Sequence, residues 1–92
     1  MKDTKIIVTI FGADKVGIVA EIARVMSQYS INIDDISQTI VQDYFVMFMI
    51  CDIKKSTYNF LEIKEAIQKQ AQELKMEVWV QKKAIFDNMH TI

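Results

Sequence analysis

The chain of 92 residues is long enough for one domain, and a domain of this size buries roughly 60–65% of the surface that its unfolded form exposes. Hydrophobic residues make up 51% of the sequence and charged residues 25%, which indicates a folded globular protein rather than a disordered segment. The net charge of −1 argues against the basic surface with which proteins bind nucleic acid or anionic membranes.

The cysteine and histidine content argues against disulfides and zinc. Cys51 is the only cysteine, and its apolar surroundings are typical of a core residue in a reducing compartment. His90, the only histidine, is expected to be exposed or to cap a helix, and one residue of each kind argues against a structural zinc site within one chain. No basic segment leads into a long apolar run, so neither a signal peptide nor a membrane-spanning helix is expected. We therefore predict a cytoplasmic protein without a metal or other cofactor.

The first two elements meet at the only glycines of the chain, Gly12 and Gly17. Residues 5–11 form an apolar, β-branched run that predicts a strand covered on both faces. Beyond the glycines the apolar positions follow a helical period as far as Tyr29, and Asp14 is expected to be the N-cap of this helix. The buried stripe of the helix is expected to contain Val19, Ile22, Ala23 and Met26.

The glycine turn has two interpretations. The first amide N–H groups of a helix lack internal partners and lie at the positive end of its dipole, so the turn is a candidate site for a carboxylate or phosphate. In the structural alternative, Gly12 only ends the strand, Asp14 only caps the helix and Gly17 only allows close packing. Short glycine motifs also occur in many proteins that bind no anion, so the pattern alone leaves both open.

Residues 31–41 predict a second strand with one irregularity. Strict alternation would put Ile33 and Ile36 on opposite faces, so an extra residue near Asp34 and Asp35 is expected as a β-bulge, which is typical of an edge strand. Adjacent acidic residues also discourage an edge from pairing with other chains. The alternative, a metal-binding role for the two aspartates, would require more acidic residues nearby.

The third predicted strand, residues 44–51, follows a tight turn at 42–43 and is apolar on both faces. One face carries Tyr44, Val46, Phe48 and Ile50, and the other carries Phe45, Met47, Met49 and Cys51. Two helices can cover only one face of a small sheet, so the second apolar face needs another partner. Self-association is the simplest explanation and favours an oligomer.

A second helix, a last strand and a short terminal helix complete the chain. Asn59 followed by Glu62 resembles a capping box, with Ser56 and Thr57 as alternative caps. The buried stripe of the second helix is expected to contain Phe60, Ile63, Ile67, Ala71 and Leu74, and the residues expected to face water include Gln68, Gln70 and Gln72. Residues 76–81 alternate as a half-buried strand whose less apolar face carries Trp79, against the sheet or a partner chain. Helical spacing predicts the short terminal helix from Ile85, Phe86 and Met89.

The predicted order is strand, helix, strand, strand, helix, strand. Short connections and right-handed crossovers leave few topologies for this order, and the favoured one is the α+β ferredoxin-like βαββαβ sandwich. Its four-stranded antiparallel sheet has the strand order 4-1-3-2, with both helices on one face. The most apolar strands, the first and third, would then be central, and the bulged second strand would lie at an edge.

Residues 12–19 between a strand and a helix, followed by residues 31–33, closely resemble the ACT domain, a small regulatory module that binds amino acids. The similarity extends over essentially the whole chain. Residues 32–39 and 84–90 resemble in particular a group of stand-alone bacterial ACT proteins that have no assigned biochemical role.

The resemblance implies a single ACT domain over residues 1–83, with the tail 84–92 docked on it. In ACT domains that bind amino acids, the ligand lies between two chains, against the loop after the first strand and the start of the second. The implied ligand-binding positions are Gly12, Ala13, Asp14, Gly17, Asn32 and Ile33. Free amides near a helix N-terminus suit an α-carboxylate, whereas the α-ammonium suits Asp14 or the Asn32 carbonyl. The family often has proline where this chain has Val16, and glycine where it has Ser30.

The implied function is a non-enzymatic homodimer, with a tetramer left open, that senses a small amino acid and acts on an unidentified regulated protein. The main alternative is a structural dimerisation module whose pocket no longer binds a ligand. RNA binding is disfavoured because the third strand lacks basic and glycine positions and the net charge is not positive. An acylphosphatase would need an arginine in the first loop, yet Arg24, the only arginine, lies mid-helix, and no nucleophile sits beside a candidate base.

Overall fold

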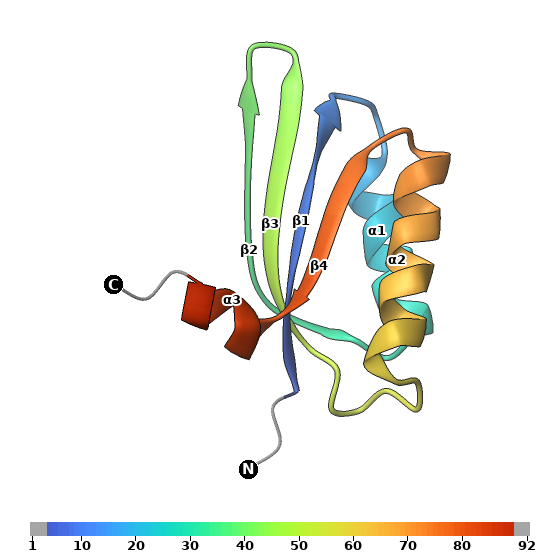
Figure 1. Cartoon of the computed structure of the whole chain (residues 1–92). Coiled ribbons are helices and arrows are strands. Elements are labelled where there is room, and N and C mark those ends of the chain that lie inside the picture. Colours follow the sequence, from blue (N-terminus) through green and yellow to red (C-terminus); the bar gives the residue numbers. More distant parts are fainter. Residues whose placement is uncertain (1–3, 90–92) are drawn as a thin grey trace.

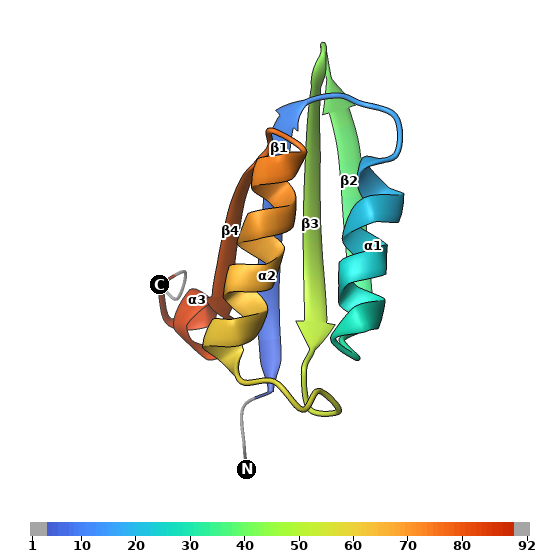
Figure 2. The same ribbon diagram turned by 90° about the vertical axis from the view of Figure 1, so that its right-hand side faces the viewer.

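Seven elements follow the predicted order in the computed structural model, which describes residues 4–89. They are β1 (Lys5–Ala13), α1 (Ile18–Gln28), β2 (Asn32–Val41), β3 (Tyr44–Asp52), α2 (Phe60–Glu73), β4 (Glu77–Lys82) and α3 (Lys83–Met89). The sheet order is β2-β3-β1-β4, and all neighbouring strands are antiparallel. Figures 1 and 2 show α1 and α2 side by side on one face of the sheet. The predicted ferredoxin-like fold and the C-terminal helix are confirmed, whereas the expectation for His90 lies outside the described residues.

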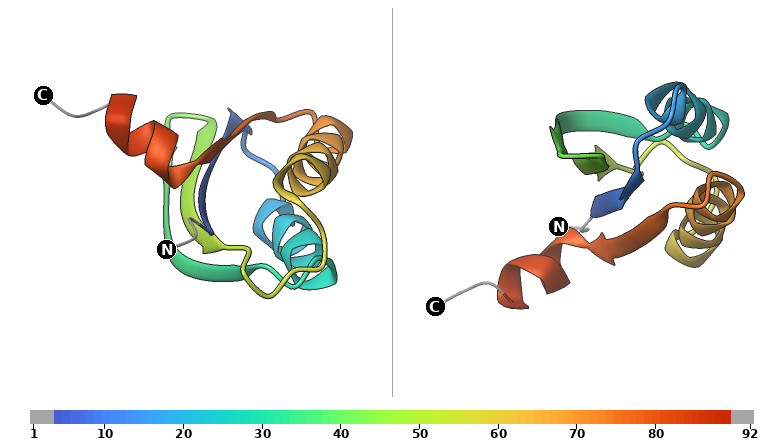
Figure 3. Two further views of the ribbon diagram at one scale, coloured as in Figure 1. Left: turned by 60° about the horizontal axis from the view of Figure 1, so that its bottom comes forward. Right: turned by 90° about the horizontal axis from the view of Figure 1, so that it is seen from above.

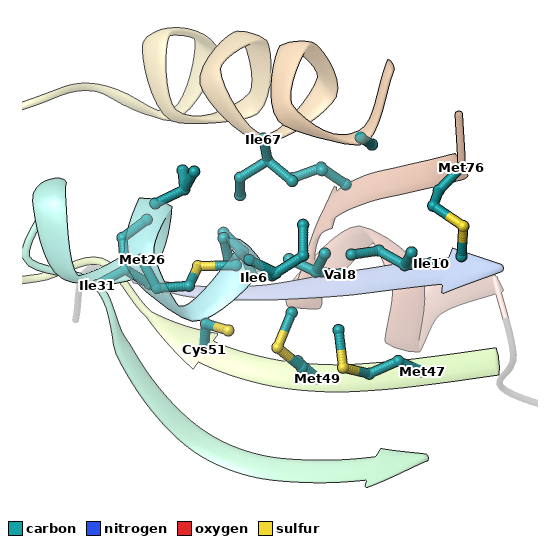
Figure 4. Close-up of a cluster of buried hydrophobic side chains, with 14 of the residues drawn as sticks. Ile6, Val8, Ile10, Met26, Ile31, Met47, Met49, Cys51, Ile67 and Met76 are labelled. Carbon is teal, nitrogen blue, oxygen red and sulfur yellow. The ribbon is translucent and has the colours of Figure 1, made fainter. Parts of the chain in front are cut away.

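The core lies between the sheet and the two long helices (Figure 4). Alternate residues of the central strands point into it and are almost completely covered: Ile6, Val8, Ile10, Met47, Met49 and Cys51. From α1 and α2 the core receives Ile18, Ile22, Val25, Met26, Ile63, Ile67 and Ala71. Burial of a large aliphatic side chain stabilises the fold by about 1.5–3 kcal/mol, so this layer is the main source of stability.

The buried stripe of α1 is rotated relative to the prediction. Ile18, Ile22, Val25 and Met26 are buried, whereas Val19 and Ala23 are exposed, so the predicted burial of these last two residues is wrong. Apolar residues occur on two sides of this helix, and the sequence therefore allows either stripe. The structure buries the one that contains Ile18, whose side chain is larger than that of Val19 and contributes more on burial.

α2 begins with the predicted capping box. Asn59 Oδ1 accepts a hydrogen bond of 2.9 Å from the Glu62 N–H, and Glu62 Oε1 accepts one of 3.0 Å from the Asn59 N–H. Gln70 differs from its prediction, because it is only 8% exposed and bridges the two helices. Its amide nitrogen donates to Glu21 at 3.1 Å, and its oxygen accepts from Arg24 at 3.4 Å. The exposed pair on α1 thus provides the polar partners that allow a glutamine to be buried.

Both long helices end in a Schellman motif built on a residue other than glycine. Ser30 has φ 55° and Lys75 has φ 58°, the left-handed conformation that this motif requires. The following N–H groups close the motifs, Ile31 to the Met26 carbonyl and Met76 to the Ala71 carbonyl, each at 2.8 Å. Each helix therefore ends at a residue that carries the steric strain of a left-handed backbone.

The predicted β-bulge lies where expected, because the pairing of β2 with β3 shifts between Ile33 and Asp35. After the shift, Ile36 and Ile40 face the same side of the sheet as Ile33, the side of the helices. Both remain exposed. The far half of β2 consequently presents apolar side chains beside α1, and this is where a groove forms.

Candidate ligand-binding site

The glycine turn joins β1 to α1 through contacts that fix its path. Gly12 lies against Met76, whose sulfur is 2.8 Å from the position that a Cβ at Gly12 would occupy. The Asp14 N–H donates a hydrogen bond of 3.0 Å to the Asp43 carbonyl in the β2–β3 turn. Gly17 has φ 88°, a left-handed conformation that glycine adopts without strain. The two glycines thus have different roles, close approach at Gly12 and backbone conformation at Gly17.

The N-cap of α1 is Gly17, so the prediction that Asp14 caps this helix is wrong. Three residues separate Asp14 from Ile18, the first helical residue, which places its carboxylate too early in the chain to cap. Glycine has no side chain to cap with, and within residues 4–89 no side-chain cap is present at this helix end. The N–H groups of the first turn, from Ile18 to Ala20, therefore remain available to a ligand.

A groove of about 470 Å³ lies in front of this first turn. One wall is formed by residues 17–20 at the start of α1, and the other by residues 38–40 near the end of β2. The lining also includes Asp14, Lys15 and Phe45. The groove combines amide donors, one cation and one carboxylate with an apolar surface, a set of groups that matches a zwitterion with a small apolar part.

Asn32 and Ile33, the other two predicted ligand-binding residues, lie at the opposite end of the sheet. Asn32 pairs across the sheet with Asp52, at the level of the start of β1, whereas the glycine turn follows the end of β1. Figure 1 shows these two ends far apart along the strands. Ile33 packs against the core. In a single chain, Asp14 and Gly17 line the groove, Gly12 and Ala13 lie just before it in the glycine turn, and Asn32 and Ile33 lie away from it.

Asn32 belongs to a polar cluster around the bulge. Its amide nitrogen donates a hydrogen bond of 2.6 Å to the Asp34 carboxylate, which also accepts one from the Lys5 ammonium. The same ammonium forms an ion pair with the Asp52 carboxylate, with 3.2 Å between Nζ and Oδ2. Hydrogen bonds from Lys5 and Asn32 lower the pKa of Asp34, and Asp34 and Asp52 raise the pKa of Lys5. The backbone N–H of Lys54, with further hydrogen bonds, lowers the pKa of Asp52 to about 2. These carboxylates are ionised at neutral pH and compensated by their neighbours.

The two acidic residues at the bulge have local partners. Asp35 accepts a hydrogen bond of 2.9 Å from the Ile36 N–H, and Asp34 pairs with Lys5 and Asn32. Over residues 4–89 there is no group of three or more His, Cys, Asp and Glu side chains placed to hold a metal ion. None of the helices in this range has the length and apolarity needed to cross a membrane.

One wall of the groove, residues 38–40, was not predicted from the sequence, and neither were Lys15 and Phe45. The sequence did contain a signal for the residues of β2. Once a bulge is placed at Asp34, alternation puts Gln38 and Ile40 on the helix side of β2, beside the start of α1.

The chain is similar to known proteins over almost its full length. The family model described as ACT domain matches residues 4–81. A UPF0237 protein from Methanococcus maripaludis is 44% identical over 87 residues, which cover 95% of this chain and 97% of that protein. One from Listeria innocua is 40% identical over 86 residues, with 94% and 97% covered. A solved ACT domain protein from Streptococcus pneumoniae superposes with a TM-score of 0.80 at 31% identity, with 99% of each chain covered. The chain therefore belongs to the ACT domain family.

Proposed function

We propose that this protein is a non-enzymatic, cytoplasmic sensor that binds a small amino acid between two copies of the chain. The observation that carries the proposal is the uncapped first turn of α1, which faces a groove. Three successive N–H groups at the positive end of a helix dipole form a good receptor for an α-carboxylate. Lys15 also lines this groove, and its ammonium binds the Leu74 carbonyl at the end of α2.

The pairing of two copies would complete the site. β2 is an edge strand that, among the described residues, pairs only with β3, so its outer edge is available. Two such edges related by a two-fold axis pair antiparallel, and the start of one strand then lies beside the end of the other. Asn32 of one copy would reach the level of Val41 in the second, close to the glycine turn. This arrangement would join all six predicted residues in one site.

The ligand would then be held at both ends. Its carboxylate would accept from the N–H groups of residues 18–20, and its ammonium would donate to the Asp14 carboxylate or to the Asn32 carbonyl of the second copy. Ile40 and Phe45 leave an apolar surface for a small side chain. Pairing would also cover Ile36 and Ile40, which are exposed in the single chain.

A second candidate is a structural dimerisation module without a ligand. The observation in its favour is that Val16, at the family's frequent proline position, is fully exposed, and that Ile36 and Ile40 are also exposed in part. These side chains would explain an apolar interface even if the groove stayed empty.

Calorimetric titration with each of the twenty amino acids, combined with light scattering, separates the two candidates. We expect one small amino acid to bind at micromolar affinity, and Asp14→Ala and Asn32→Ala to weaken binding while the mass in solution stays unchanged. Glu65→Ala, which removes an exposed carboxylate from α2 outside the groove, is the matched control and should bind normally. An oligomer that binds no amino acid would favour the dimerisation module. Unchanged affinity in both Asp14→Ala and Asn32→Ala would rule out this groove as the site.

A further inference from the structure

The sheet face that α1 and α2 leave open is divided into two halves by α3. Figures 1 and 3 show α3 on the side of the sheet opposite the two long helices, across one end of the strands. There the ring of Phe86 lies 5.9 Å from that of Phe48. Ile7 points to this face, since its neighbours Ile6 and Val8 point into the core, yet it is only 2% exposed. α3 therefore covers part of this half, beside β1 and β4.

The other half is bare and apolar. We call it the bare half, and it consists of Phe11, Thr39, Val41, Tyr44, Val46 and Trp79. Tyr44 and Trp79 are each 60% exposed, and the ring of Trp79 lies 5.3 Å from that of Phe11. None of these six residues is charged, and Glu77 lies at the rim beside Phe11.

The accessible area of the bare half is too small for a stable interface formed by this surface alone. Each aromatic side chain buries about 150–250 Å² when covered completely, so Tyr44 and Trp79 together leave roughly 200–300 Å² accessible. A stable interface takes about 800 Å² from each partner, which the bare half alone does not provide. A second element must therefore contribute to the contact.

The outer surface of α3 can supply this second element. With Phe86 turned toward its own sheet, the helical period turns Ala84 and Asn88 away from it, and Ile85 and Met89 share one flank. Both flank residues are exposed, and Ala84 is small enough for close approach. α3 lies at the opposite end of the strands from Tyr44 and Val41. A two-fold axis perpendicular to the strands would therefore place α3 of one copy over the bare half of the other.

We propose that two copies of the chain pack through this face, with α3 of each copy covering the bare half of the other. The contact is isologous, because each copy gives the same two surfaces. The two α3 helices fill the space between the sheets, and each aromatic pair of Phe11 and Trp79 is buried under a helix of the other copy. This interface is separate from the outer edge of β2 and does not depend on ligand binding. Together with pairing of two β2 edges it produces a tetramer.

Trp79, the only tryptophan of the chain, reports on this interface directly. We would measure acrylamide quenching of its fluorescence and, in parallel, the mass of the full chain by sedimentation velocity. In the wild-type protein at high micromolar concentration Trp79 should be protected. Tyr44→Arg places a charge in the bare half, and it should increase quenching several-fold and halve the mass. Gln72→Arg is the matched control, since Gln72 is exposed near the end of α2, on the opposite side of the sheet, and it should change neither quantity.

A second variant tests the role of α3. Ala84→Arg adds bulk and charge on the side of α3 that faces away from its own sheet, so it should expose Trp79 and halve the mass as Tyr44→Arg does. Circular dichroism of both variants checks that the fold is intact. A wild-type Trp79 that is quenched as readily as in Tyr44→Arg would overturn the proposal. So would an Ala84→Arg variant with wild-type mass and wild-type quenching.

Discussion

Lys15 Nζ donates a hydrogen bond of 2.7 Å to the main-chain carbonyl of Leu74, the C-cap residue of α2. This contact ties the glycine turn to the end of the second helix, 59 residues later in the sequence. The ammonium also lies at the negative end of the α2 dipole, where a cation is favourable. The position of the groove in front of α1 therefore depends on α2.

Lys15→Met should loosen the glycine turn while keeping most of the side-chain packing. We expect the free energy of unfolding to fall by about 0.5–1 kcal/mol, because one exposed, charge-assisted hydrogen bond is lost. Any amino acid that binds in the groove should bind several-fold more weakly. Urea denaturation and calorimetry measure the two effects, and Lys69→Met, on the exposed side of α2, is the control. Equal affinity in Lys15→Met and the wild type would show that the contact does not hold the site.

Ser30→Gly should stabilise the protein. Ser30 has φ 55° at the Schellman position of α1, and a left-handed backbone costs a residue with a Cβ about 1–2 kcal/mol more than glycine. The greater freedom of glycine in the unfolded chain offsets part of this gain, so we expect about 0.5–1 kcal/mol of added stability. Ser27→Gly, the same substitution inside α1, should instead destabilise the protein. Thermal unfolding of both variants checks this, and a decrease in stability for Ser30→Gly would contradict it.

The fold could be predicted because its signals are local. The two apolar faces of β3, the broken alternation at Asp34 and the spacing of Asn59 and Glu62 each involve only a few neighbouring residues. Each of these signals also agrees with one topology, so they support one another. The short terminal helix followed from the same periodicity.

The site was predicted less well because contacts between distant segments determine it. Asp14 has the chemistry of an N-cap, but its backbone is held by Asp43, and Gly17 takes the cap position instead. The sequence alone predicts that Gln70 is on the surface, because the ion pair of Glu21 and Arg24 that allows its burial lies on the other helix. Sequence patterns describe the period of a helix, but not which distant residue will meet it.

The stability should depend on pH through Asp52. Hydrogen bonds from the Lys54 N–H and from the side chains of Thr4 and Lys5 lower its pKa to about 2 in the folded protein, against about 3.9 in an unfolded chain. Asp52 then stabilises the fold above roughly pH 4, and this contribution is lost as the pH falls from about 4 to 2. The difference in urea midpoint between the wild type and Asp52→Asn should therefore shrink over this range. A difference that stays constant from pH 7 to pH 2 would contradict the assignment.

Cys51 should react with thiol reagents only when the protein opens. The side chain of this β3 residue is completely buried between the sheet and the helices, and burial raises its pKa to about 12, so almost no thiolate is present at pH 8. Labelling of the native protein should then require an opening event, and its rate should follow the fraction of molecules that are open. Ile67→Ala, which removes a core side chain of α2 and costs about 2–5 kcal/mol, should accelerate labelling by a factor that matches the loss of stability measured in urea. Glu65→Ala, on the exposed side of the same helix, should leave the labelling rate near that of the wild type. If native Cys51 reacted as fast as the thiol of the urea-unfolded chain, the strand that carries it would not be part of a stable core.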